Sequence, residues 1–206
     1  MLYRYLLLVR FALYNVVAVA GLAAVYLQGW VDPVIEADLL ELSGVIVLLF
    51  LYGFLLSAHL VWRTSIDLNA VKLGTVPVST VPGRYLGAIK SADGESRDVL
   101  RGVLRLKLTG RIAIVRHVAN SLVFLGLIGT VIGFIIALAG VDPIGASNAE
   151  RTSEMVTKLI TGMSVALNTT LVGAMLHVWL IVNYRLLTTG TINLLTATLE
   201  AGETQP

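Results

Sequence analysis

The chain has 206 residues, of which 56% are hydrophobic and 14% are charged, and its formal net charge is +2. This composition excludes a soluble globular domain, because such domains carry about 25% charged residues. It predicts an all-α integral membrane protein, and the small basic excess gives no reason to expect nucleic-acid binding. The chain has no cysteine, so disulfides and thiolate metal sites are excluded, and we expect no cofactor.

Four stretches are apolar over the ~20 residues that a helix needs to cross a membrane. They span residues 11–30, 42–62, 119–140 and 157–183. The first is too long for the apolar core of a secretion signal, and Arg10 and Asn15 interrupt its start, so we expect it to be retained as a span. We expect Arg10 to snorkel towards the membrane surface and Asn15 to make an interhelical hydrogen bond.

Basic residues are concentrated on one side of these spans. Ten of the fifteen Lys and Arg residues lie between Arg63 and Arg116, whereas the loop 32–41 has four acidic residues and no basic one. Short loops rich in Lys and Arg stay in the cytoplasm. The sequence therefore predicts four transmembrane helices with both ends in the cytoplasm and membrane lipid as a partner.

The basic segment between the second and third spans has two parts. Pro77, Pro82 and Gly83 break the segment in its middle, and we expect no helix to run through that part. Apolar residues then recur among basic ones, and no proline follows before the outer loop, so we predict one helix from about Glu95 to Gly140. A similar extension is expected after the fourth span. Both long helices would thus extend into the cytoplasm.

These elements predict four consecutive parts of the chain. They are a first hairpin (1–62), a basic cytoplasmic segment (63–117), a second hairpin (118–185) and a cytoplasmic tail (186–206). Two interpretations of the extensions stay open. They form either a basic amphipathic surface that lies on the membrane or packs between subunits, or a docking site for another protein.

Each of the last two spans has a stripe of small residues on one face. In the third span the stripe is Gly126, Gly129, Thr130, Gly133, Ala137 and Gly140. In the fourth it is Gly162, Ala166, Thr169, Gly173 and His177, with Thr170 at its edge. Such stripes are typical of close packing in any helical membrane protein. Two of them exceed what one four-helix bundle needs to bury, which predicts a homo-oligomer.

The polar groups within the last two spans limit the chemistry that they can perform. An ion that crosses hydrocarbon needs a titratable or coordinating group at depth. His177 is the one titratable residue there, and it is either a proton relay or an interfacial residue with a satisfied hydrogen bond. The hydroxyls of Thr130, Thr169 and Thr170 offer only hydrogen bonds or oxygen ligands, so an ion-carrying carboxylate would belong to a partner. Ser164 and Asn168 point to another side, where we expect hydrogen bonds to a neighbouring helix.

The residues themselves are more specific than their spacing. Residues 125–133 read Leu-Gly-Leu-Ile-Gly-Thr-Val-Ile-Gly, and residues 162–173 read Gly-Met-Ser-Val-Ala-Leu-Asn-Thr-Thr-Leu-Val-Gly. These two motifs, in this order across a short outer loop, closely resemble the signature of the MotA/TolQ/ExbB proton-channel family. The first half of the chain agrees only in architecture, since four spans with both ends inside are the arrangement of the MotA branch.

The resemblance implies a channel-forming subunit of a motor or energiser in the bacterial inner membrane, driven by H⁺ or Na⁺. Five copies would surround a dimer of single-span partners of the MotB/ExbD/TolR type. Thr130 and Thr170 match the family's path-lining threonines, and the family's packing glycines match Gly126, Gly129, Gly133, Gly162 and Gly173. Two positions depart from TolQ and ExbB: Val165 replaces a glutamate and Trp179 replaces a proline.

Two other classes of function remain as alternatives. A structural tetraspan scaffold of an envelope complex would bury the same stripes without conducting ions, and its activity would be insensitive to uncouplers. An intramembrane enzyme is disfavoured, because no Ser/His pair, paired carboxylates or metal-ligand cluster lies at one predicted depth.

Overall fold

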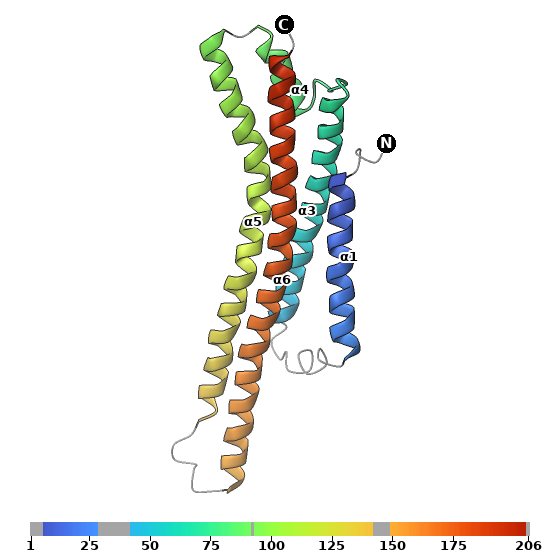
Figure 1. The fold of residues 1–206 in the computed structure, drawn as a ribbon. Helices are drawn as coiled ribbons and strands as arrows, with labels where there is room; N and C mark the ends of the chain where they lie inside the picture. Colours follow the sequence, from blue (N-terminus) through green and yellow to red (C-terminus); the bar gives the residue numbers. More distant parts are fainter. Residues whose placement is uncertain (1–5, 29–41, 92, 142–148, 205–206) are drawn as a thin grey trace. The chain divides into compact units, whose positions relative to one another are not determined.

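The computed structural model describes residues 6–28, 42–91, 93–141 and 149–204, and all regular structure in these ranges is helical. The helices are α1 (Leu6–Leu27), α3 (Leu42–Lys72), α4 (Val81–Ile89), α5 (Gly94–Ala139) and α6 (Ala149–Glu203) (Figure 1). Within the described ranges, all but the short α4 are long and apolar enough to cross a membrane. The predicted all-α fold with four long apolar helices is confirmed.

The two C-terminal helices are far longer than a bilayer requires. α5 has 46 residues and α6 has 55. At 1.5 Å per residue they extend ~70 and ~80 Å, more than twice the hydrocarbon thickness. The continuous helix predicted from Glu95 to Gly140 matches α5 to within one residue at each end, and the predicted continuation beyond the fourth span is also helical.

The expectation of no helix around Pro82 and Gly83 is wrong. α4 begins at Val81, and Pro82 lies in its first turn, where a helix needs no backbone N–H. The Thr80 hydroxyl caps this helix by accepting a hydrogen bond from the Gly83 amide (3.2 Å). A Cβ atom at Gly83 would collide with the Pro77 carbonyl, so this turn requires glycine. The proline and the glycine therefore position the start of a helix.

The chain forms two compact units, each assembled from separate segments. The first unit comprises Met1–Val16, Phe54–His117 and Ile181–Pro206, and the second comprises Val17–Gly53 and Val118–Leu180. In the first unit, α4 packs against the N-terminal part of α5 and the C-terminal part of α6. The core of this packing is Val71, Val81, Tyr85, Leu86, Ile89, Leu104, Leu108 and Leu194.

The part of α5 that lies in the basic segment has one apolar face that is buried in the first unit. Leu104, Leu108, Ile112 and Val115 form one face of α5 and are all buried inside the protein. A helix lying on a membrane would instead turn its apolar face to the lipid. This face of α5 is therefore used inside the protein, whereas Val99, Leu106 and Ile114 of the same segment stay exposed to lipid or to another protein.

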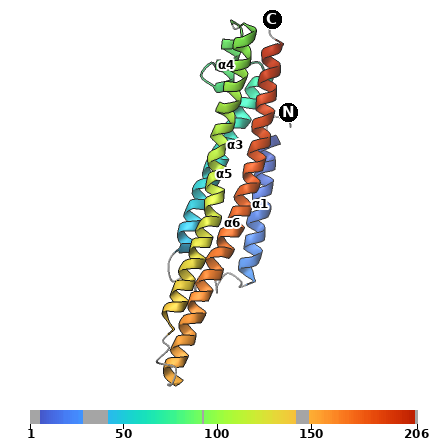
Figure 2. The same cartoon turned by 90° about the vertical axis from the view of Figure 1, so that its left-hand side faces the viewer.

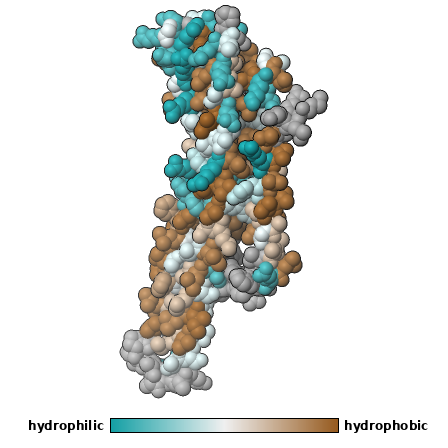
Figure 3. All heavy atoms as spheres, viewed as in Figure 1, coloured by the Kyte–Doolittle hydropathy of each residue, from teal (hydrophilic) through white to brown (hydrophobic). Residues whose placement is uncertain are grey.

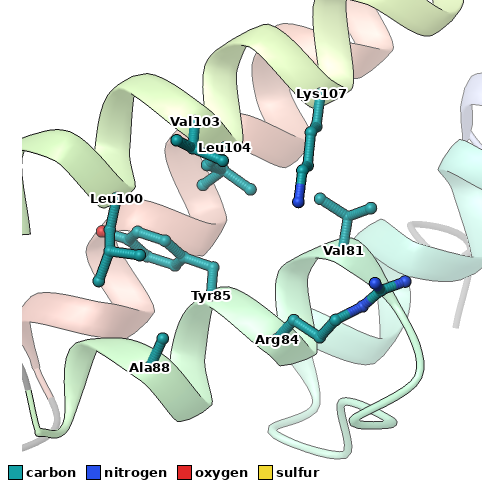
Figure 4. A pocket seen from close by; sticks show the side chains of 8 residues that line it. All are labelled: Val81, Arg84, Tyr85, Ala88, Leu100, Val103, Leu104 and Lys107. Atoms are coloured by element: carbon teal, nitrogen blue, oxygen red, sulfur yellow. The ribbon is translucent and has the colours of Figure 1, made fainter.

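A small groove remains in the first unit between α4 and α5. Its volume is about 210 Å³, and side chains of the two helices face each other across it (Figure 4). Apolar residues form most of the lining, with Arg84 from α4 and Lys107 from α5 also contributing. The lining is Val81, Arg84, Tyr85, Ala88, Leu100, Val103, Leu104 and Lys107.

The first unit also contains a buried pair of asparagines that joins α1 to α6. The Asn15 amide donates to Asn183 Oδ1 (2.8 Å), and the Asn183 amide donates to Asn15 Oδ1 (3.1 Å). Their exposed fractions are 7% and 0%. The interhelical hydrogen bond predicted for Asn15 is confirmed.

Candidate functional site

The stripes of small residues meet each other in the second unit. There, α5 and α6 lie side by side in both ribbon views (Figures 1 and 2). A Cβ atom at Gly133 would lie 2.5 Å from the Gly162 carbonyl oxygen, and one at Gly173 would lie 2.7 Å from the Leu122 carbonyl oxygen. The two backbones therefore touch along a seam, which we call the α5–α6 seam.

The seam removes one argument for oligomerisation. Each small-residue stripe was expected to need a surface beyond a single bundle, but the stripe of α5 is buried by the stripe of α6 in the same chain. The stripes therefore say nothing about subunit contacts. The surface left for other molecules is apolar, as Figure 3 shows for the visible face of the second unit. It includes Leu127, Val131, Phe134, Met163, Leu167 and Leu171.

Two of the predicted path residues come together at the edge of this seam. The hydroxyls of Thr130 and Thr170 contact each other, and each lies 3.1 Å from the carbonyl oxygen of Gly126. A hydroxyl has one hydrogen to donate, so two hydrogens serve three contacts. The result is a compact cluster of three oxygens, which we call the oxygen cluster. Thr130 is half-buried and Thr170 is exposed, so the cluster is open to one side.

Thr169 lies elsewhere, inside the seam. Its side chain is 1% exposed and packs against Gly129. Its hydroxyl donates within α6, to the carbonyls of Val165 (2.9 Å) and Ala166 (3.2 Å). The structure thus separates Thr169 from Thr130 and Thr170, although the three were grouped by sequence.

Ser164 and Asn168 bond to each other instead of to another helix. The Asn168 amide donates to the Ser164 hydroxyl across one turn of α6, at 3.4 Å. Within the described residues, neither side chain bonds to another helix. Residues four apart are neighbours on a helix, so this local partner competes with a distant one.

His177 is held by a hydrogen bond to the neighbouring helix. Its Nδ1 lies 2.7 Å from the carbonyl oxygen of Ala119, a fully buried residue of α5. A carbonyl can only accept, so Nδ1 carries the hydrogen and Nε2 of the neutral ring is left as an acceptor. The histidine ring is half-buried.

The seam contains almost no charge. Residues 118–139 of α5 and 159–180 of α6 include no carboxylate, lysine or arginine, and His177 is their one ionisable residue. No group of three or more His, Asp or Glu residues within the described ranges is placed to hold a metal ion. Val165 is 1% exposed, so the position of the missing glutamate lies inside the packing. Trp179 packs on Phe50, with ring centroids 5.1 Å apart.

Sequence reasoning missed the part played by Gly126. The motif suggested that this glycine permits close packing, which it does, since a Cβ atom there would lie 3.1 Å from the Thr169 carbonyl oxygen. Its carbonyl is also the shared acceptor of both path threonines. The pattern of side chains contains no signal for this second role, because it depends on the register of α5 against α6.

The model of the MotA/TolQ/ExbB proton channel family matches residues 84–200, more than half of the chain. Comparisons with curated proteins and with solved structures give no match. The family match begins in α4 and ends near the end of α6, so it covers the seam, the basic segment from residue 84 onward and the tail up to residue 200.

Proposed function

Because the chain belongs to the MotA/TolQ/ExbB proton channel family, we propose that it is the channel-forming subunit of an ion-driven membrane motor or energiser. Members of this family are channel subunits and not enzymes, and the chain is a multi-pass membrane protein. We further propose that it acts in the bacterial inner membrane, with both ends in the cytoplasm, and that the permeating ion passes the oxygen cluster.

The oxygen cluster is the observation that carries this proposal. It gathers two hydroxyls and a carbonyl at one point of an otherwise apolar surface, and it is open to one side. Oxygens in such an arrangement replace part of the hydration shell of a passing ion. We assign Thr169 to packing of the seam, since its hydroxyl is buried and bonded within its own helix.

The missing carboxylate supports a partner. Three oxygens replace only part of the hydration shell of an ion, and a charge within hydrocarbon is costly. Because the two seam segments carry no acidic residue, the compensating charge has to come from another chain. We propose a dimer of single-span proteins of the MotB/ExbD/TolR type, each presenting a carboxylate to the oxygen cluster, with five copies of this chain around it.

Replacement of the Thr170 hydroxyl tests this function. Thr170→Val keeps the shape of the side chain and removes its oxygen, so we expect ion flux into proteoliposomes to be lost while co-purification with the single-span partner is unchanged. Thr170→Ser is the matched control, because it keeps the hydroxyl, and it should retain flux. Full flux through Thr170→Val would remove the site assignment.

The same proteoliposomes distinguish a channel subunit from a structural scaffold. A scaffold predicts no ion flux in the wild-type complex and an activity in cells that is insensitive to uncouplers. A channel subunit predicts flux that follows the ion gradient and stops when the gradient is dissipated.

A further inference from the structure

We propose that His177 is a proton-transfer residue on the same path as Thr130 and Thr170. This inference rests on the proposed function and adds to it a second residue that acts on the ion. The alternative is a purely structural role, in which the hydrogen bond of His177 to Ala119 only holds α6 against α5.

The first support is the placement of two polar contacts one heptad apart. Thr170 reaches the Gly126 carbonyl, and His177 reaches the Ala119 carbonyl. Seven residues along α6 lead from Thr170 to His177, and seven residues backwards along α5 lead from Gly126 to Ala119. Seven residues rotate a helix by about 700°, only ~20° from two full turns. Both contacts therefore lie on the same edge of the α5–α6 seam.

The second support is the chemistry that remains to the ring. The Ala119 carbonyl fixes the hydrogen on Nδ1, so the free acceptor is Nε2. A hydronium ion can give its proton to Nε2, leaving a water molecule and an imidazolium. The imidazolium then returns that proton from Nε2 to a second water molecule further along the path. Thr170 and His177 are ~10 Å apart along the helix axis, so water molecules must connect them.

The third support is the scarcity of other ionisable groups near His177. The other described helical segments of the second unit, 17–27 of α1 and 42–53 of α3, contribute as ionisable side chains only Tyr26 and Tyr52, both exposed. The nearest ionisable residues along α5 are Arg116 and His117, both exposed, and Tyr184 and Arg185 follow His177 along α6. Arg151, Glu154 and Lys158 lie towards the other end of α6, beyond Thr170. A lasting positive charge among apolar side chains is costly. A charge that is held briefly and passed on suits this position better than a permanent one.

Two substitutions of His177 distinguish a role in proton transfer from a purely structural role. Asparagine places an amide N–H where histidine has Nδ1, so His177→Asn can keep the bond to Ala119 but cannot take up a proton. His177→Gln has no donor at that position and also cannot titrate. His59→Asn, at an exposed histidine of α3, is the control. The complex with its single-span partner is reconstituted in liposomes, and proton uptake is followed with an internal pH dye from pH 5 to 8, where histidines change charge.

We expect both His177 variants to lose proton uptake, by about a hundredfold as for other positioned proton-transfer groups, and to lose its pH dependence. His59→Asn should behave as wild type. Normal uptake and pH profile in His177→Asn would overturn the relay, as would failure of both variants to bind the partner, since His177 would then be structural. A wild-type complex that carries sodium in place of protons would refute the inference and leave the channel proposal standing. Loss of flux in Thr170→Val alone would likewise support the channel without the relay.

Discussion

Buried polar side chains in the first unit differ in how far their surroundings compensate for the loss of water. Asn15 and Asn183 satisfy each other through two amide hydrogen bonds, so their burial leaves little unpaired. Asp67 of α3 is also only 7% exposed. Its pKa is raised above the ordinary value of 3.8, because the loss of water outweighs the attraction of Arg63 and Arg111. Folding therefore favours the protonated form of Asp67 over the carboxylate.

This raised pKa of Asp67 predicts a pH-dependent loss of stability. The native protein keeps the proton to a higher pH than the unfolded chain, so the free energy of unfolding falls as pH rises from about 3.8 to the raised value. Asp67→Asn removes this titration. Measured by intrinsic fluorescence in detergent between about pH 4 and 7, the melting temperature of the wild type should fall relative to that of Asp67→Asn. A relative rise would mean that the two arginines outweigh burial.

At the scale of single elements, the register of α5 against α6 depends on backbone contact. Gly133, Gly162 and Gly173 each bring one helix backbone against the other, and no larger residue fits without movement. Gly94, Gly102 and Gly110, in the N-terminal part of α5, have no such role, since a Cβ atom at any of them would meet nothing within 4 Å. Two glycines of one helix therefore differ only in what faces them.

This difference predicts opposite effects of one substitution. Gly133→Ala would place a methyl group 2.6 Å from the Ala166 backbone nitrogen, so it should destabilise the protein by about 1–3 kcal/mol, the usual cost of overpacking. Gly110→Ala is the matched control and should be neutral or stabilise by up to about 1 kcal/mol, because alanine favours helix. Thermal unfolding of the purified protein measures both. Equal changes in stability for the two variants would show that the α5–α6 seam accommodates the added methyl group without loss of stability.

Helix length and the facing stripes were accessible from the sequence, because both follow from residue spacing along one helix. The absence of proline over α5 and the 3.6-residue period placed its ends and its small-residue face. Features that depend on contacts between two helices were predicted less well. The sequence placed Thr169 in the stripe and Thr170 at its edge, as observed, but it grouped both hydroxyls on the ion path, although that of Thr169 is buried and bonded within its own helix. The start of α4 did carry a local signal that the prediction missed, since Thr80 is its N-cap and Pro82 lies in its first turn.

At the scale of the whole molecule, the long helices expose apolar side chains that need lipid or another protein to cover them. Only 28% of the 18-residue apolar stretch of α6 is buried within the chain. Met163 and Met175 of this helix are exposed to similar extents, 51% and 48%. Met163 lies one heptad before Thr170, about 20° from it around the helix, whereas Met175 lies about 140° away. If partner helices cover the oxygen cluster, the first methionine faces them and the second does not.

Cysteine crosslinking tests this arrangement without background, since the chain has no cysteine of its own. Met163→Cys should form crosslinks to a cysteine placed beside the ion-carrying acid of the single-span partner, because the oxygen cluster and that acid must approach each other for an ion to pass between them. Met175→Cys, with equal exposure and the same substitution, should react with lipid-soluble maleimide but not with the partner. Crosslinks from Met175→Cys and none from Met163→Cys would place the partner on the wrong face of α6, and the oxygen cluster would then face lipid, where it could serve no ion.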